Sequence, residues 1–115
     1  MTLSLGKAQL LRIFVGENDQ HKGHPIYEAI VMKAREMGLA GATVLRGPMG
    51  FGHSSHLHTA KILRLSQDLP MVVEIVDSEE RIQALLEAID PIVGAASALV
   101  TLESVQVLQH GPRQK

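Results

Sequence analysis

The chain has 115 residues, of which 45% are hydrophobic, and its 11 basic and 12 acidic residues give a formal net charge of −1. This composition excludes an intrinsically disordered chain, and the absence of a basic stripe argues against a nucleic-acid or anionic-membrane partner. The chain contains no cysteine, signal-peptide pattern or membrane-length apolar run, so we expect a cytoplasmic protein without disulfides or membrane insertion.

The first part of the chain predicts a strand, a loop and a helix. Residues 8–16 alternate loosely in the manner of a strand, with Leu11, Ile13 and Val15 on one face, and the polar residues 17–24 predict a loop. Pro25 occupies the favoured first position of a helix, apolar residues follow at helical spacing, and Gly38 supplies a C-terminal stop. The pattern therefore predicts a helix over about 25–37.

Two further strands flank a glycine-rich segment. Residues 41–47 predict a second strand that runs directly into this segment. Residues 69–77, rich in β-branched side chains, predict a third strand. Between them, the apolar positions of residues 57–66 fit neither the helical nor the strand period, and we expect an extended arm there.

A second helix and a fourth strand complete the pattern. Asp77 followed three residues later by Glu80 is typical of a helix N-cap, and one apolar helical face follows it. We expect Asp90–Pro91 to end or restart this helix and Gly94 to close the segment. Residues 97–109 predict the fourth strand.

The order of these elements is β-α-β-β-α-β. Right-handed crossovers fold this order most simply into a ferredoxin-like α+β sandwich, in which two helices cover one face of a four-stranded antiparallel sheet. We expect one domain over residues 1–115, with an ordered core at about 8–109 and a tail at 110–115.

The second face of this sheet is also expected to be apolar. Leu10 and Phe14 alternate with the core positions of the first strand, and Val72 and Val76 do so in the third. Two helices can cover only one face of the sheet. The uncovered apolar face therefore predicts a homo-oligomer.

Residues 46–58, RGPMGFGHSSHLH, form the most unusual segment of the chain. Glycines let backbone N–H groups approach an anion, and an arginine adds positive charge. Phe51 in such a loop would either stack on a ligand or fill a subunit interface. A plain connecting turn between two strands is the simpler alternative for the glycines. The candidate ligand-binding residues here are Arg46, Gly47, Gly50, Phe51 and Gly52.

Three histidines end the same segment, at His53, His56 and His58. Imidazole is a common ligand of zinc and copper, but this spacing is not a recognised ligand motif and the loop contains no acidic residue. Surface histidines are the more economical interpretation, and we expect neither a metal nor another cofactor. We also expect no enzyme, because the sequence contains no nucleophile elbow, zinc-protease motif or evident carboxylate pair.

From about Leu10 to Val107 the chain resembles a PII-like family of bacterial and archaeal proteins, similar in fold to the PII nitrogen-regulatory signal-transduction proteins. Four motifs carry the resemblance: GATVLRG at 41–47, GFG at 50–52, LSQDLP at 65–70 and EIVDSEE at 74–80.

The resemblance implies a trimer that binds an adenine nucleotide or a similar anionic metabolite between subunits. Such a trimer would act by contact on a protein partner, for example a membrane transporter. In PII proteins a basic residue and Gly-Phe-Gly begin the loop after the second strand. Here Gly50, Phe51 and Gly52 match the tripeptide, and Arg46, alone or with Gly47, takes the place of the preceding basic residue. The phosphate-binding turn after the second helix retains Gly94 but lacks the lysine.

The alternative is a trimeric divalent-metal-binding protein. It would be similar in shape to the cation-tolerance proteins of the same fold class. Three-fold symmetry would then multiply the histidines His53, His56 and His58.

Overall fold

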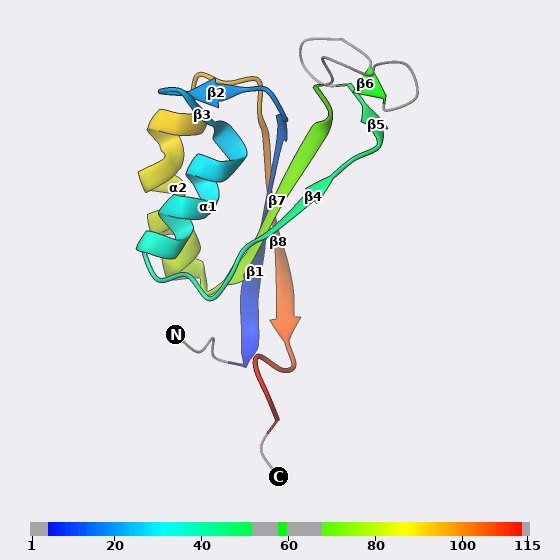
Figure 1. Ribbon diagram of the computed structural model, residues 1–115. Coiled ribbons are helices and arrows are strands. Elements are labelled where there is room, and N and C mark those ends of the chain that lie inside the picture. Colours follow the sequence, from blue (N-terminus) through cyan, green and yellow to red (C-terminus); the bar gives the residue numbers. More distant parts are fainter. Residues whose placement is uncertain (1–4, 52–57, 60–67, 114–115) are drawn as a thin grey trace.

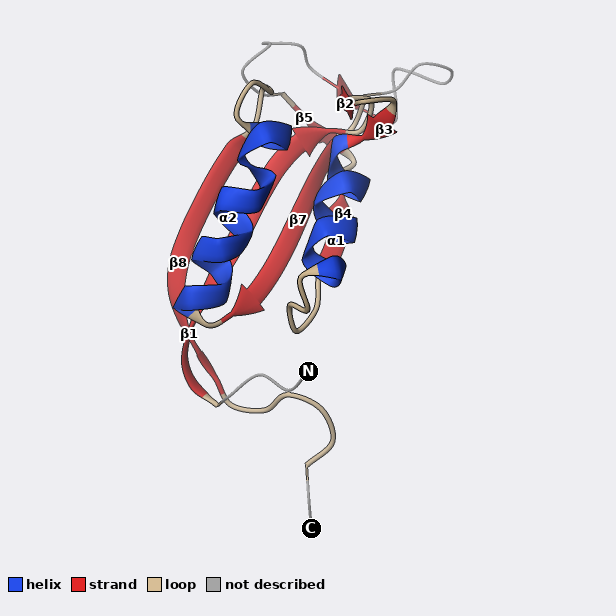
Figure 2. Cartoon of the chain, turned by 90° about the vertical axis from the view of Figure 1, so that its left-hand side faces the viewer, coloured by secondary structure: helices blue, strands red, loops and turns tan. Residues whose placement is uncertain are grey.

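The computed structural model describes residues 5–51, 58–59 and 68–113. In this part of the chain, two helices lie side by side on one face of a four-stranded sheet (Figures 1 and 2). The helices are α1 (Ile26–Glu36) and α2 (Glu79–Val93). The strands lie in the order β4 (Thr43–Arg46), β7 (Pro70–Asp77), β1 (Gly6–Gly16) and β8 (Leu99–Val107), all antiparallel to their neighbours. The ferredoxin-like α+β prediction is confirmed.

The core lies between the sheet and the helices. Alternate residues of the two central strands point toward the helices because successive side chains of a strand face opposite sides. Each helix contributes one apolar stripe at a spacing of three or four residues. The buried residues are Leu11, Ile13 and Val15 of β1, Met71, Val73 and Ile75 of β7, Ile26, Ile30 and Ala34 of α1, and Ile82, Leu85 and Ile89 of α2.

Helix α1 follows a short hairpin that the sequence analysis missed. Strands β2 (Gln20–His21) and β3 (His24–Pro25) pair within the expected loop, and Lys22 and Gly23 turn the chain with φ angles of 51° and 81°. Pro25 is therefore the N-cap of α1 rather than its first helical residue, because it remains extended to pair in the hairpin. Gly38, at φ 78°, ends the helix as expected.

Helix α2 begins one residue later than expected, and Gly94 closes the segment as expected. Ser78, not Asp77, is the N-cap, and its hydroxyl accepts a hydrogen bond from the Arg81 amide at 3.3 Å. The helix also runs through Pro91 to Val93. Pro91 lacks the amide that would bond the carbonyl of Glu87, yet the helix continues for two more residues.

The glycine-rich segment begins at the far end of β4. Strand β5 (Met49–Gly50) pairs with β6 (His58–Thr59) in a separate two-stranded sheet beyond the upper end of β4 (Figure 1). Two residues of the expected arm at 57–66 are thus extended, and residues 57 and 60–66 lie outside the described part. None of the described helices combines the length and the apolar character that crossing a membrane requires.

Candidate functional site

Arg46 is the last residue of the edge strand β4 and pairs with Met71 of β7. Its side chain is half exposed, and its Nη2 donates to Oε1 of Glu17 at 3.0 Å. Glu17 is anchored in turn, since its amide donates to the carbonyl of Leu69 at 2.8 Å. The expected basic residue therefore lies at the end of the strand, in contact with solvent and held by one carboxylate.

The first two glycines after Arg46 lie against the ring of Pro70. A Cβ atom on Gly47 would stand 2.8 Å from Cγ of Pro70, and one on Gly50 would stand 3.0 Å from the same atom. The amide of Gly47 also donates to the carbonyl of Pro70 at 2.8 Å. A side chain at either position would crowd Pro70, so packing alone favours glycine there, whether or not a ligand binds.

Phe51 is 72% exposed and leaves its ring available for a ligand or a partner. Gly52, the third glycine of the expected site, lies outside the described residues, as do His53 and His56. Of His58 only the backbone is described. Within the described part of the chain, no group of three or more histidine, aspartate or glutamate side chains is arranged to hold a metal ion.

Gly94 caps α2, and its amide donates to the carbonyl of Asp90 at 2.7 Å. The turn after it enters β8, which forms the opposite edge of the sheet from β4. Arg46 ends β4 and the Gly94 turn precedes β8. Because these two strands run in opposite directions, the turn and Arg46 lie at the same end of the sheet. Within one subunit the strands β7 and β1 separate them, so the chain does not bring Gly94 to Arg46.

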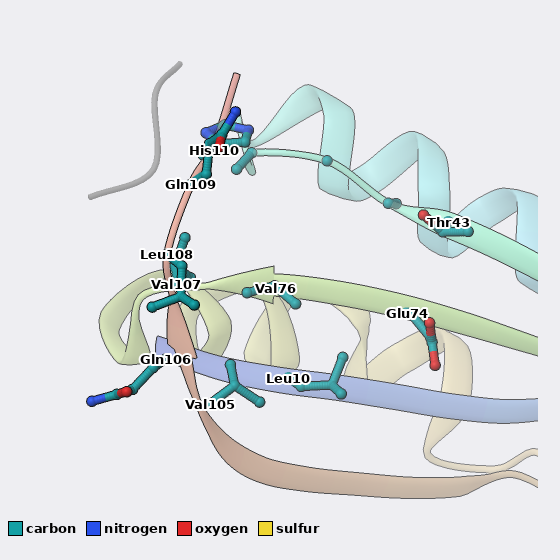
Figure 3. A pocket seen from close by; sticks show the side chains of 13 residues that line it. Leu10, Thr43, Glu74, Val76, Val105, Gln106, Val107, Leu108, Gln109 and His110 are labelled. Carbon is teal, nitrogen blue, oxygen red and sulfur yellow. The ribbon is translucent and has the colours of Figure 1, made fainter. Parts of the chain in front are cut away.

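A pocket of about 760 Å³, which the sequence analysis did not anticipate, lies on the sheet face away from the helices. We call it the open-face pocket. Leu10 of β1 and Val76 of β7 lie next to each other in it, and Thr43 of β4 and Glu74 of β7 extend it along the sheet (Figure 3). Residues 40–43 form one wall and residues 105–110, from the end of β8 onward, form the other.

The open-face pocket is largely apolar, with polar groups at its edges. Its floor is aliphatic, and the small residues Ala40, Gly41 and Ala42 leave the backbone of one wall accessible. Pockets that bind small molecules are typically apolar, with a few polar groups that orient the ligand. The run of small residues before β4 is the one local signal that could have indicated a wall of this kind.

A charged belt crosses the same sheet face between its two apolar rows. Nε of Arg12 donates to Glu74 at 2.8 Å, and the guanidinium also contacts Glu103. The hydrogen bonds that the guanidinium of Arg12 donates to Glu74 and Glu103 raise the pKa of Arg12 above its ordinary value. Leu10 and Val76 lie on one side of this belt and Phe14 and Val72 on the other, so the second face is apolar only in part.

Strand β4 connects the two candidate regions. Thr43 at its start lines the open-face pocket, and Arg46 at its end borders the glycine-rich segment. At about 3.3 Å per residue, the two positions are separated by roughly 10 Å along the edge of the sheet. Because Thr43 and Arg46 lie three residues apart, their side chains leave opposite faces of the strand, so a ligand that contacts both must pass around the β4 edge of the sheet.

Comparison with known proteins places the chain in a family. Residues 8–107 match the DUF190 family, described as Uncharacterized ACR, COG1993. A UPF0166 protein from Aquifex aeolicus (strain VF5) is 42% identical over 102 residues, which cover 89% of this chain and 94% of that protein.

Two solved structures are similar in fold. CPII from Thiomonas intermedia K12, a nitrogen regulatory PII-like protein bound to ADP, AMP and bicarbonate, superposes with a TM-score of 0.70 at 21% identity over 94% of both chains. CutA from Synechococcus elongatus PCC7942 gives a TM-score of 0.58 at 11% identity, covering 88% of this chain and 79% of CutA. The family match over residues 8–107 and the PII-like fold confirm the resemblance: the chain belongs to the DUF190 (UPF0166) family.

Proposed function

We propose that this protein is a PII-like regulatory protein rather than an enzyme. It would bind an adenine nucleotide along the β4 edge, between the subunits of a homotrimer, and act by contact on a protein partner. The observation that carries the proposal is the placement of an apolar pocket and an exposed arginine at the two ends of one edge strand. CPII, which shares the fold, is bound to ADP, AMP and bicarbonate.

The base of the nucleotide would occupy the open-face pocket. Leu10 and Val76 would contact the faces or edge of the ring, and the backbone of Gly41 and Ala42 would bond its polar edge, since Asp77 already holds the Ala40 amide. Burial of an aromatic ring against aliphatic side chains contributes to binding in proportion to the apolar area removed from water.

The phosphates would lie toward the glycine-rich segment. There the guanidinium of Arg46 would pair with a phosphate, and it would have to exchange its bond to Glu17 for the new one. Gly50 and Gly52 would present backbone N–H groups, and the exposed ring of Phe51 would stack on the ligand or close the cleft over it.

A second subunit would complete the site. Arg46 and the Gly94 turn lie at the same end of the sheet but at opposite edges. If the β4 edge of each subunit faces the β8 edge of the next, the Gly94 turn of one subunit comes to the Arg46 of its neighbour. A heterologous contact of this kind closes into a ring when the rotation between subunits permits it, and the PII-like fold favours a three-fold ring.

Isothermal titration with ATP, ADP, AMP, cyclic AMP and bicarbonate tests the ligand. We expect heat with at least one adenine nucleotide and a loss of affinity in R46A. No heat from any nucleotide at millimolar concentration would exclude the nucleotide proposal. If only bicarbonate gives heat, an anion-binding site at Arg46 would still be supported, but the open-face pocket would have no role in binding a base.

Light scattering after size exclusion, with and without the ligand that binds, tests the assembly independently of affinity. A wild-type protein that is trimeric but binds no nucleotide would separate the failure of the ligand proposal from that of the trimer.

A further inference from the structure

The carboxylate of Asp77 is buried and bonded to two backbone amides. Asp77 is the last residue of β7 and is 1% exposed. Its Oδ1 accepts from the Ser78 amide at 2.7 Å, and its Oδ2 accepts from the Ala40 amide at 2.9 Å. Nη1 of Arg81, in the first turn of α2, lies 3.7 Å from Oδ2. One carboxylate thus connects the start of α2 with the segment that joins α1 to β4.

Ala40 lies where the pairing of β4 with β7 would continue. Thr43 pairs with Glu74, so continuing that register back by three residues sets Ala40 opposite Asp77. β4 begins only at Thr43, and the side chain of Asp77, not a backbone carbonyl of β7, accepts the Ala40 amide. Residues 40–43 are therefore held on β7 at both ends, by the ladder at Thr43 and by Asp77 at Ala40.

This doubly held segment is the wall of the open-face pocket. Asp77 does not itself line the pocket and faces the helix layer on the other side of the sheet. A buried carboxylate that loses one of its amides leaves an unpaired polar group, and bonds to a charged acceptor are stronger than neutral ones. The Ala40 end of the wall is thus fixed by an interaction that is costly to break.

We propose that Asp77 is a positioning residue for the open-face pocket and acts through the Ala40 amide. Where it concerns a nucleotide, this inference rests on the function proposed above. Through the same carboxylate, the pocket wall is tied to the first turn of α2, so a displacement of that turn is transmitted to the wall. The signal in the sequence, Asp77 just before a helix, indicates only a cap; its bond to Ala40 depends on the tertiary fold.

The substitution D77N tests this role, with E80Q as its matched control. Asparagine keeps the shape of the side chain and one carbonyl oxygen, but its NH2 group cannot accept the second amide. E80Q removes a negative charge from an exposed position in the first turn of the same helix. Amide hydrogen exchange, resolved by NMR at Ala40, reports the bond directly.

We expect Ala40 exchange to accelerate on the order of tenfold in D77N and to stay unchanged in E80Q. The affinity for ADP should fall by a similar factor in D77N alone, and melting temperature serves as the measure of general destabilisation. Unchanged Ala40 exchange with accelerated Ser78 exchange in D77N would mean that the asparagine oxygen has kept the Ala40 amide, and D77A, which removes both acceptors, then decides. Unchanged Ala40 exchange in D77A, or fast exchange with unchanged ADP affinity, would overturn the positioning role.

The role of Asp77 can still be tested if D77N does not fold or if the wild type does not bind ADP. If D77N does not fold, the wild type alone decides: Ala40 must exchange more slowly than the exposed Gly41, and equal rates would overturn the proposal. If the wild type binds no ADP, the nucleotide proposal fails, while the exchange rates at Ala40 still decide whether Asp77 fixes the wall.

Discussion

Nη2 of Arg46 lies 3.0 Å from Oε1 of Glu17, so the end of β4 is joined to the residue that follows β1. The Arg46 side chain is 53% exposed and that of Glu17 is 23% exposed. A partly exposed pair of this kind contributes little to stability, because solvent screens the attraction. Its larger consequence is electrostatic: an anion that approaches Arg46 also meets the charge of Glu17.

Glu17→Gln is therefore expected to increase the affinity for anionic ligands, and to do so more for ATP than for AMP. The gain should be at most about fivefold for ATP, the range expected of an exposed charge pair. Titration of ATP and AMP at two salt concentrations measures it, because screening should reduce the gain at the higher one.

Glu36→Gln is the matched control for this charge effect, since Glu36 is an exposed carboxylate paired with Lys33 on α1 at 3.3 Å. Its affinities should remain those of the wild type. An equal gain for ATP and AMP in Glu17→Gln would contradict the charge competition at Arg46.

Gly47→Ala should destabilise the fold. The added Cβ would stand 2.8 Å from Cγ of Pro70, so the proline ring or the start of the glycine-rich segment must move. Overpacking of this kind costs about 1–3 kcal/mol. Urea unfolding of the variant and the wild type measures the difference, and an unchanged free energy of unfolding would show that the segment moves away without cost.

Gly41→Ala is predicted to separate binding from stability. No heavy atom lies within 4 Å of a Cβ at this position, so the free energy of unfolding should stay the same or rise slightly. Gly41 nevertheless lines the open-face pocket, where the methyl group would occupy ligand space. Weaker nucleotide binding with an unchanged melting temperature is the expected result. If Gly41→Ala binds the nucleotide with wild-type affinity, the base does not occupy the open-face pocket.

The strands and helices were largely predictable because their signals are local. Alternation around Leu11 and Ile13 marks β1, and Gly38 marks the end of α1, where the structure shows φ 78°. The cap of α2 was placed one residue early because Asp77 has the right side chain for a cap. What decided against it was burial under the helices and the amide of Ala40, neither of which is visible in the sequence.

The candidate site was predictable only in part. Arg46 and Phe51 are exposed, as a binding role requires, and the local sequence around them is distinctive. The open-face pocket was missed because Leu10, Val76 and Val105 come from three strands that only the sheet order brings together. Alternation in a strand shows that a residue faces away from the core, but not that its face is hollowed.

Val72 lies in an apolar row across the open face, paired with Phe14 of β1 on one side and with Leu45 of β4 on the other. The helices do not cover this row, and burying it between subunits would stabilise an assembly by roughly 25 cal/mol per Å² of apolar area, before the entropy of association is subtracted.

Val72→Glu would place a charge in the middle of that row, so we expect a protein that no longer assembles or that precipitates. Met32→Glu is the control, because Met32 is 69% exposed on α1, away from the sheet. Size exclusion with light scattering should give a mass near three times the chain mass of 12.5 kDa for the wild type and for the control. A stable wild-type monomer at micromolar concentration would refute the trimer, and with it a nucleotide site shared between subunits.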